Sequence, residues 1–455
     1  MKLKRLIASL GAIALVSGAI VGSGVSANAA TRTVTVWSPY SGDNLAKWNA
    51  SIARIEKANP GLTIKSVGDV DMAKSLAAIN SGTGPDISVS SGAGNLGWFC
   101  GTGAWQNLST LVAGRNGLKI DKVFTPASVK YSISGHTRCA LPSIATESFG
   151  FYYNKDLLAK AGFKTAPKTT ADLLNYSQKL TTFDSSGNIK TAGFVPWAGY
   201  YGFEMDAMWL GYMFNARWYN ADNSPGFSSD AKWAKAFQWQ HDFIAKVYGG
   251  GDFKKGSTAL TKFVAARGDE WGAGHDFITG RVAMKLDADW MAPMFCDPDG
   301  WALNPCTKPA VNFGTAPFPV DAAVSKVYGG GVIGGQLMGI SKGSKNVADA
   351  WIVMKALATD ETLATDYANA NGSVPVLKSS LASGKITFPA VYQTFYDIAS
   401  NANSGYHLLP NAGEHLDDAV IYDFMSAWQA GSTTNLKEGL AAASTKLAGI
   451  LARNN

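Results

Sequence analysis

The pattern of apolar and polar residues changes period several times along the first ninety residues. Residues 33–37 are rich in β-forming side chains, and Leu45, Trp48, Ile52 and Ile55 then recur at helical spacing. Asn59-Pro60-Gly61 ends that helix. The pattern predicts strand, helix, strand, helix and strand over residues 33–37, 45–58, 62–67, 72–79 and 86–90. Because parallel strands need crossover helices, this order favours a βαβαβ unit with a parallel sheet.

A second α/β region follows, beginning at the strand-like residues 149–153. The same patterns predict helices over 171–180, 230–247, 347–358 and 416–430, and strands over 282–286 and 336–340. No short fixed repeat is present, which excludes solenoids and propellers. With 455 residues the chain is too long for one compact core, so we expect two α/β lobes.

Composition agrees with a folded protein: 46% of the residues are hydrophobic and 16% are charged. The net charge of +6 comes from basic and acidic residues scattered along the chain. Binding to nucleic acid requires a concentrated basic surface, so nucleic acid is not an expected partner.

Residues 1–29 have the parts of a signal peptide. Lys2, Lys4 and Arg5 precede an apolar stretch over residues 6–21, and Ala27-Asn28-Ala29 forms a small-residue cleavage site. A spanning helix is the alternative, but several glycines and a serine dilute the apolar stretch. We expect an exported protein, periplasmic or extracellular, with no lipid-acceptor cysteine near the cleavage site.

The four cysteines of an exported chain are expected to form disulfides. Cys296 and Cys306 flank a turn-rich loop whose ends can meet, so we pair them and, by exclusion, pair Cys100 with Cys139. A zinc site is the alternative, but the usual ligand spacings are absent. No metal and no cofactor are predicted.

Seven groups of residues along the chain are informative when they are taken together: 34–37 with 45–61, 82–87, 141–142 with Glu147 and 152–158, 277–284 with Trp290, 334–341, 350–351 and 372–375. In this order they resemble the extracellular solute-binding proteins of carbohydrate ABC transporters, the group that includes maltose-binding proteins. The resemblance spans most of the chain after the leader.

The resemblance implies two α/β lobes of the periplasmic-binding-protein type, each a mostly parallel sheet flanked by helices, with the ligand cleft between them. The N-terminal lobe would comprise residues 30–145 and 334–383, and the C-terminal lobe residues 146–333 and 384–455. It also implies binding of a neutral mono- or oligosaccharide and its delivery to a membrane permease, without chemistry. We expect a monomer.

Sugars are held by aromatic faces and by polar groups that bond the hydroxyl rim, and the chain has 14 Trp and 16 Tyr. Trp290 matches the family's stacking tryptophan, and Glu147, Gly335 and Gln336 lie in family segments. Ser90 and Ala93 stand where maltose-binding proteins have an aromatic and an acidic residue, so maltose itself is not assumed. The predicted ligand-binding residues are Trp37, Asn44, Ser90, Glu147, Trp197, Tyr200, Asp289, Trp290, Gly335 and Gln336.

The alternative function is a secreted glycoside hydrolase acting on a similar sugar. Such an enzyme needs two carboxylates flanking the scissile bond, and Asp287 with Asp289 is one possible pair. Turnover of a sugar would favour the enzyme, and saturable binding without turnover would favour the receptor.

Overall fold

The computed structural model describes residues 32–134, 137–201, 207–300, 306–405 and 416–454. The predicted signal peptide, residues 1–29, lies outside these ranges. Within the described part, every helix is too short or too polar to cross a lipid bilayer.

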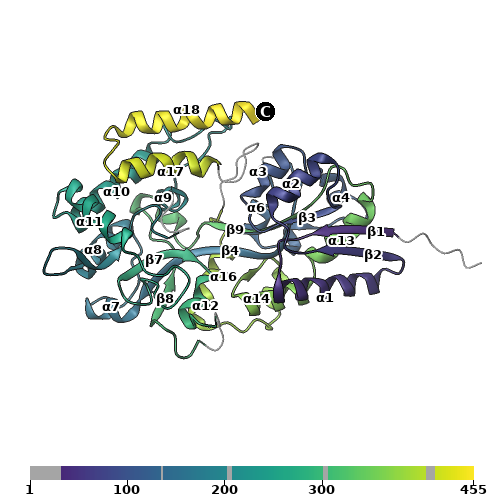
Figure 1. Cartoon of the computed structure of the whole chain (residues 1–455), viewed down its shortest axis with the longest axis horizontal. Helices are drawn as coiled ribbons and strands as arrows, with labels where there is room; N and C mark the ends of the chain where they lie inside the picture. The colour runs from purple at the N-terminus through teal and green to yellow at the C-terminus, as the bar shows by residue number, and fades with distance from the viewer. Residues whose placement is uncertain (1–31, 135–136, 202–206, 301–305, 406–415, 455) are drawn as a thin grey trace, which may run out of the picture.

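The predicted βαβαβ unit forms the start of the N-terminal lobe (Figure 1). Strand β1 pairs in parallel with both β2 and β3. Helix α1 buries Trp48, Ile52 and Ile55, the residues whose spacing predicted the helix. The unit comprises β1 (Arg32–Trp37), α1 (Gly42–Ala58), β2 (Leu62–Val67), α2 (Met72–Ser81) and β3 (Ile87–Ser90). Further helices of this lobe are α3 (Asn95–Gly101), α4 (Ser109–Ala113), α5 (Ile120–Val123), α6 (Pro126–Tyr131), α13 (Val347–Ala358), α14 (Glu361–Asn371) and α15 (Lys378–Ala382).

The second lobe is built around β6 and β7, which also pair in parallel. Its strands are β5 (Thr182–Phe183), β6 (Ile189–Phe194), β7 (Val282–Ala288) and β8 (Phe313–Ala316). Its helices are α7 (Lys155–Lys160), α8 (Thr170–Leu180), α9 (Ala207–Phe214), α10 (Ala231–Tyr248), α11 (Phe253–Ala265), α12 (Met291–Cys296), η1 (Ala322–Val327), α17 (Leu416–Gln429) and α18 (Leu436–Asn454). The short helices η2 (Ala390–Tyr392) and α16 (Gln393–Ser400) follow each other, and α16 packs against β4 and α6. The predicted strand and helices of this region are confirmed to within a few residues.

Two long strands, β4 (Leu141–Asn154) and β9 (Ile333–Ile340), run between the lobes (Figure 1). The first half of β4 pairs with β9 and the short β10 (Val374–Pro375), and its second half pairs with β7 and β8. All antiparallel pairs of the described sheet involve β4, β9 or β5. The lobes thus share one sheet, in the order β2-β1-β3-β9-β4-β7-β6-β5.

Both predicted disulfides are confirmed. Cys100 in α3 bonds Cys139, just before β4, with their Cα atoms 5.8 Å apart. Cys296 at the end of α12 bonds Cys306, with Cα atoms 5.2 Å apart. Each bridge therefore ties a short helix to a neighbouring segment, and neither cysteine pair is available to a metal.

Candidate ligand-binding site

The loops that follow β1 and β2 are joined by backbone hydrogen bonds. Ser38 N–H donates to the carbonyl of Val67 at 2.9 Å, and Val70 N–H donates to the carbonyl of Ser38 at 3.1 Å. Asp69 N–H donates to the carbonyl of Tyr40 at 2.9 Å. Asp69 has φ of 56°, a left-handed conformation that aspartate tolerates better than most residues. The pairing of β1 and β2 thus continues beyond the strands and fixes the backbone of Asp69.

A cavity of about 770 Å³ lies at these loops, beside the carboxyl ends of β1, β2 and β3. This is the position at which open parallel sheets hold ligands. The lining residues are Pro39, Asp69, Val70, Asp71, Met72, Ala73, Ser91 and Trp98.

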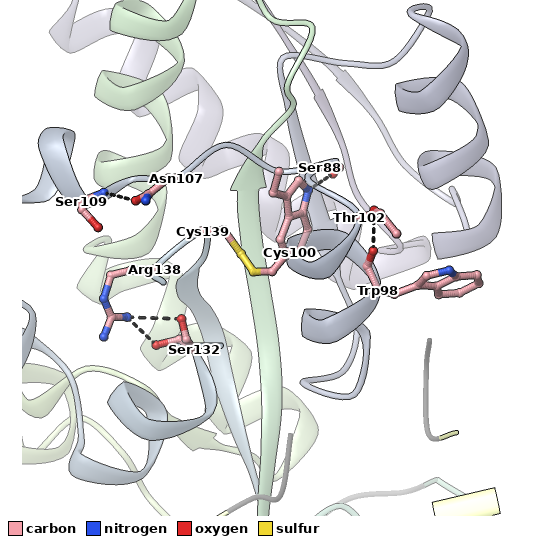
Figure 2. The surroundings of a disulfide bond; sticks show 10 residues. Ser88, Trp98, Cys100, Thr102, Asn107, Ser109, Ser132, Arg138 and Cys139 are labelled. Carbon is pink, nitrogen blue, oxygen red and sulfur yellow. Dashed lines mark hydrogen bonds between the residues drawn. A yellow bond between two sulfur atoms is a disulfide. The ribbon is translucent and has the colours of Figure 1, made fainter. Parts of the chain in front are cut away.

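Trp98 supplies the aromatic surface of this cavity. It lies on α3, whose opposite side buries Leu96 and Phe99, and its half-buried ring points away from the Cys100–Cys139 disulfide (Figure 2). The disulfide and the ring contact between Phe99 and Trp105, whose centroids are 4.4 Å apart, hold α3 in place. The ring of Trp98 is therefore presented by a well-anchored helix.

The cavity combines this ring with two exposed carboxylates, Asp69 and Asp71. Asp71 also caps α2, accepting a hydrogen bond from Lys74 N–H at 2.7 Å with one carboxylate oxygen. Carboxylates accept hydrogen bonds from hydroxyl groups, and an indole face packs against apolar C–H groups. The arrangement suits a ligand with an apolar face and a rim of hydroxyls.

Four predicted site residues come together where β4 and β9 cross between the lobes: Glu147, Asp289, Gly335 and Gln336. The Gln336 side chain accepts a hydrogen bond from the Tyr40 hydroxyl at 2.8 Å and donates one to the Tyr367 hydroxyl at 3.0 Å. Gly335 has φ of 151°, and a Cβ there would lie 2.3 Å from the Tyr131 hydroxyl oxygen. Only glycine fits this position.

Glu147 lies on β4 opposite Gly334, and a Cβ at Gly334 would be 2.8 Å from its carboxylate. Burial raises the pKa of Glu147 to about 7. The negative charge of Glu147 also acts on Tyr131, Tyr367 and Asp289. The carboxyl group therefore titrates near neutral pH, where the protonated and ionised forms are both populated, and it shares its environment with a second acid.

Asp289, directly after β7, is fully buried. Its Oδ2 accepts a hydrogen bond from Val374 N–H at 3.4 Å, whereas its Oδ1 has no hydrogen-bond partner among the described residues. Burial, and to a smaller extent the charge of Glu147, raises the pKa of Asp289 well above its usual range. Two acids with raised pKa values therefore lie at the junction of the lobes.

Trp290 follows Asp289 and forms the N-cap position of α12. Its half-buried ring meets the ring of Phe149 edge-on, with centroids 5.2 Å apart. Because Phe149 begins the second half of β4, Trp290 lies beside the segment that joins the lobes.

The other predicted residues lie apart from this junction. Trp37 is the last residue of β1 and Ser90 is the last residue of β3, and the cavity residues Pro39 and Ser91 follow them closely. The Ser90 hydroxyl donates a hydrogen bond to the carbonyl oxygen of Gly92 at 2.8 Å. Asn44 on α1 exchanges amide hydrogen bonds with Asn371 at 2.9 and 3.0 Å. Trp197 and Tyr200 are buried in the core of the second lobe, where the Tyr200 hydroxyl donates to Asp276.

Asp287, the possible partner of Asp289 in a hydrolase, forms an ion pair with the buried Lys285 at 2.8 Å. Lys285 Nζ also lies 3.1 Å from Nε2 of His275, whose pKa is strongly lowered by burial and then by the charge of Lys285. Asp287 is thus part of a buried ionic cluster. Among the described residues, no three His, Cys, Asp or Glu side chains are grouped so that they could hold a metal ion.

Sequence reasoning missed Asp69, Asp71 and the assignment of Trp98 to the cavity. The predicted residues Trp37 and Ser90 do end β1 and β3, and Pro39 and Ser91 from the loops that follow these strands line the cavity. The rule that ligands lie at the carboxyl ends of parallel strands, applied to the loop after β2, would have found Asp69 and Asp71.

Two α/β lobes joined by crossing strands, with a cavity beside the carboxyl ends of parallel strands, define the two-lobed binding-protein fold. The sequence pattern of the bacterial extracellular solute-binding proteins matches residues 38–364, and the chain belongs to that family.

Solved structures with the same fold include three sugar-binding proteins. The MalE sugar-binding protein of Xanthomonas citri has 18% sequence identity and a TM-score of 0.72, and the match covers 92% of this chain and 98% of the MalE chain. The protein CpMnBP1 with mannobiose bound has 21% sequence identity and a TM-score of 0.69, and the match covers 91% of this chain and 99% of the CpMnBP1 chain. An ABC transporter solute-binding protein of Thermotoga lettingae bound with α-D-tagatose has 21% sequence identity and a TM-score of 0.64, and the match covers 92% of this chain and 100% of the Thermotoga chain.

Proposed function

We propose that this protein binds a neutral mono- or oligosaccharide between its lobes and delivers it to the permease of an ABC transporter. The observation that carries the proposal is the cavity that Trp98, Asp69 and Asp71 line together. A pyranose has an apolar C–H face for the ring and hydroxyls for the carboxylates.

The preference for a neutral sugar follows from charge. The lining of the cavity contains two carboxylates and no arginine or lysine. An acidic sugar would be repelled by the carboxylates and would find no cation to pair with. Mannobiose and tagatose, bound by two of the neighbours in fold, are both neutral sugars.

The junction of the lobes would supply the second wall of the site. In this proposal Trp290 stacks on the sugar from the second lobe, and Glu147, Gln336 and Asp289 support the contact from the crossing strands. The lobes are residues 30–145 with 334–383 and residues 146–333 with 384–455. The mature protein would be an exported monomer, and the sugar would leave it chemically unchanged.

The test is a panel of neutral mono- and oligosaccharides, first by thermal shift and then by isothermal titration calorimetry. A ligand that binds only the native state raises the melting temperature, so the right sugar will be recognised even at modest affinity. We expect stoichiometric, saturable binding, with the sugar recovered intact by chromatography after prolonged incubation. Hydrolysis products would favour the glycosidase, and signals only from amino acids, peptides or acidic sugars would contradict the proposal.

A further inference from the structure

A groove of about 720 Å³ lies between the β5–β6 hairpin and helices α10 and α11. Four exposed lysines line it: Lys246, Lys254, Lys255 and Lys262. Lys246 is on α10 and the other three are on α11, so the packing of these two helices brings the four side chains to one groove. In Figure 1 these helices lie at the end of the molecule opposite the N-terminal lobe, and no residue of the groove lines the cavity at the ends of β1 to β3.

The lining of this lysine groove has four lysines and one acidic residue, Asp252, and so an excess of positive charge. Among the described residues, none of the four ammonium groups has a carboxylate within ion-pair distance. Asp252, the one acidic residue of the lining, caps α11 by accepting a hydrogen bond from Lys255 N–H at 2.9 Å. Asp184 in the hairpin accepts hydrogen bonds from Ser186 N–H and Asn188 N–H, both at 2.9 Å. The carboxylates near the groove are thus engaged with backbone amides.

The placement of two of these lysines runs against local helix energetics. Lys254 and Lys255 lie in the first turn of α11, where the helix dipole favours acidic side chains and disfavours cations. Lys246, in the last turn of α10, is in the favourable place. Residues that break a local rule without a compensating contact commonly serve a function rather than stability.

The composition of the groove indicates the kind of partner. Lysine is depleted in protein–protein interfaces and arginine is enriched there, whereas this lining contains four lysines and no arginine. The lysine ammonium group is a compact point charge on a flexible side chain, so it can pair with anionic groups whose positions along a polymer vary. A flat lipid surface would not fill a concave groove, but a flexible linear chain would.

We propose that the lysine groove binds linear inorganic polyphosphate outside the cell. Because the groove and the cavity are on separate parts of the molecule, the polymer would hold the protein while sugar binding proceeds. This inference follows from the extracellular family and from the groove, and it does not depend on the sugar proposal.

The experiment measures binding of long-chain inorganic polyphosphate to the mature protein by fluorescence anisotropy of the labelled polymer. We expect saturable binding at 50 mM salt that weakens at least tenfold at 300 mM salt, because exposed charges are screened. Lys254→Glu with Lys255→Glu should weaken binding at least tenfold. The control with the same charge change, Lys57→Glu with Lys65→Glu on α1 and β2, should bind within threefold of wild type.

A second groove variant, Lys246→Gln with Lys262→Gln, removes charge without reversing it, so it tests the groove even if the charge-reversal variant does not fold. The melting temperatures of both groove variants and of the control variant are measured to verify that each is folded. Equal binding by wild type and both groove variants would overturn the proposal, as would the absence of saturable binding at 50 mM salt. Vesicles with 30% anionic phospholipid form a second arm. Binding to vesicles but not to polyphosphate, reduced by Phe183→Ala at the exposed hairpin, would identify a membrane partner and contradict the proposal.

Discussion

Trp98 and Trp290 are the two aromatic residues on which the proposed sugar contact rests, one from each lobe. Trp98 lies on the cavity wall, and Trp290 lies beside the β4 segment that joins the lobes. Both rings are half-buried, as expected for side chains that keep one face available to a ligand.

Replacing either ring by alanine should weaken sugar binding by about 2 to 4 kcal/mol, or roughly 30- to 1000-fold in Kd, as at aromatic hot spots. Trp271→Ala is the control, since Trp271 is a surface residue with 49% of its area exposed. Calorimetry gives the affinity, and circular dichroism with the ligand-free Tm verifies the fold. If Trp290→Ala or Trp98→Ala binds within threefold of wild type, that ring has no stacking role.

The stability of the protein should depend on pH through Glu147. The pKa of Glu147 is raised by burial to about 7 from an ordinary value of 4.5. Between these pH values the folded protein retains a proton that the unfolded chain has released, so the free energy of unfolding falls as pH rises and levels off above pH 7.

Glu147→Gln removes this titration. Between pH 5 and pH 8, wild type should lose about 2 kcal/mol more stability than Glu147→Gln does. Urea unfolding at both pH values measures the difference. Identical pH dependence in the two proteins would show that Glu147 has an ordinary pKa.

Among the elements, β9 depends on a backbone that other residues cannot adopt. At Gly335, φ is 151° and a Cβ would meet the Tyr131 hydroxyl and the carbonyl oxygen of Ala145, at 2.3 and 2.9 Å. Gly335→Ala should therefore lower the free energy of unfolding by about 2 to 3 kcal/mol. Gly343→Ala, where nothing lies within 4 Å of the added Cβ, should be nearly neutral. Equal effects in chemical denaturation would refute the steric argument.

The two disulfides should differ in their contribution to stability. The Cys100–Cys139 bridge spans 39 residues and the Cys296–Cys306 bridge spans 10. In the loop-entropy model their removal costs about 4 and about 3 kcal/mol. Denaturation of the Cys→Ser double variants measures both values, and a larger loss for the shorter loop would contradict the entropic explanation.

The elements themselves were largely predictable, because α1, α10 and β7 have clear apolar periodicity. The full length of β4 was not predictable: the sequence predicts a strand from Phe149, whereas β4 begins at Leu141, because different partners pair with its two halves.

The roles of single residues were harder to predict than the elements. Trp197 and Tyr200 have the composition of a sugar site but lie in a core, and the sequence does not distinguish the two environments. Asp69 reaches the cavity through hydrogen bonds between loops about thirty residues apart, which no local pattern reveals.

At the scale of the whole molecule, the two lobes share a sheet through β4 and β9, and the acids and polar groups of the junction lie on these strands or beside them. Movement of one lobe relative to the other must bend this segment. A sugar that contacts both lobes would favour the closed arrangement by its greater affinity for that state. We therefore expect one sugar to contact both lobes at once.

The most direct test is a crystal structure of the protein with the best sugar from the panel. We expect the sugar in the cavity, with its apolar face on Trp98 and hydroxyls bonded to Asp69 or Asp71, while Trp290 contacts it from the second lobe. A sugar bound elsewhere, or one that touches a single lobe and contacts neither tryptophan, would contradict the proposed binding mode.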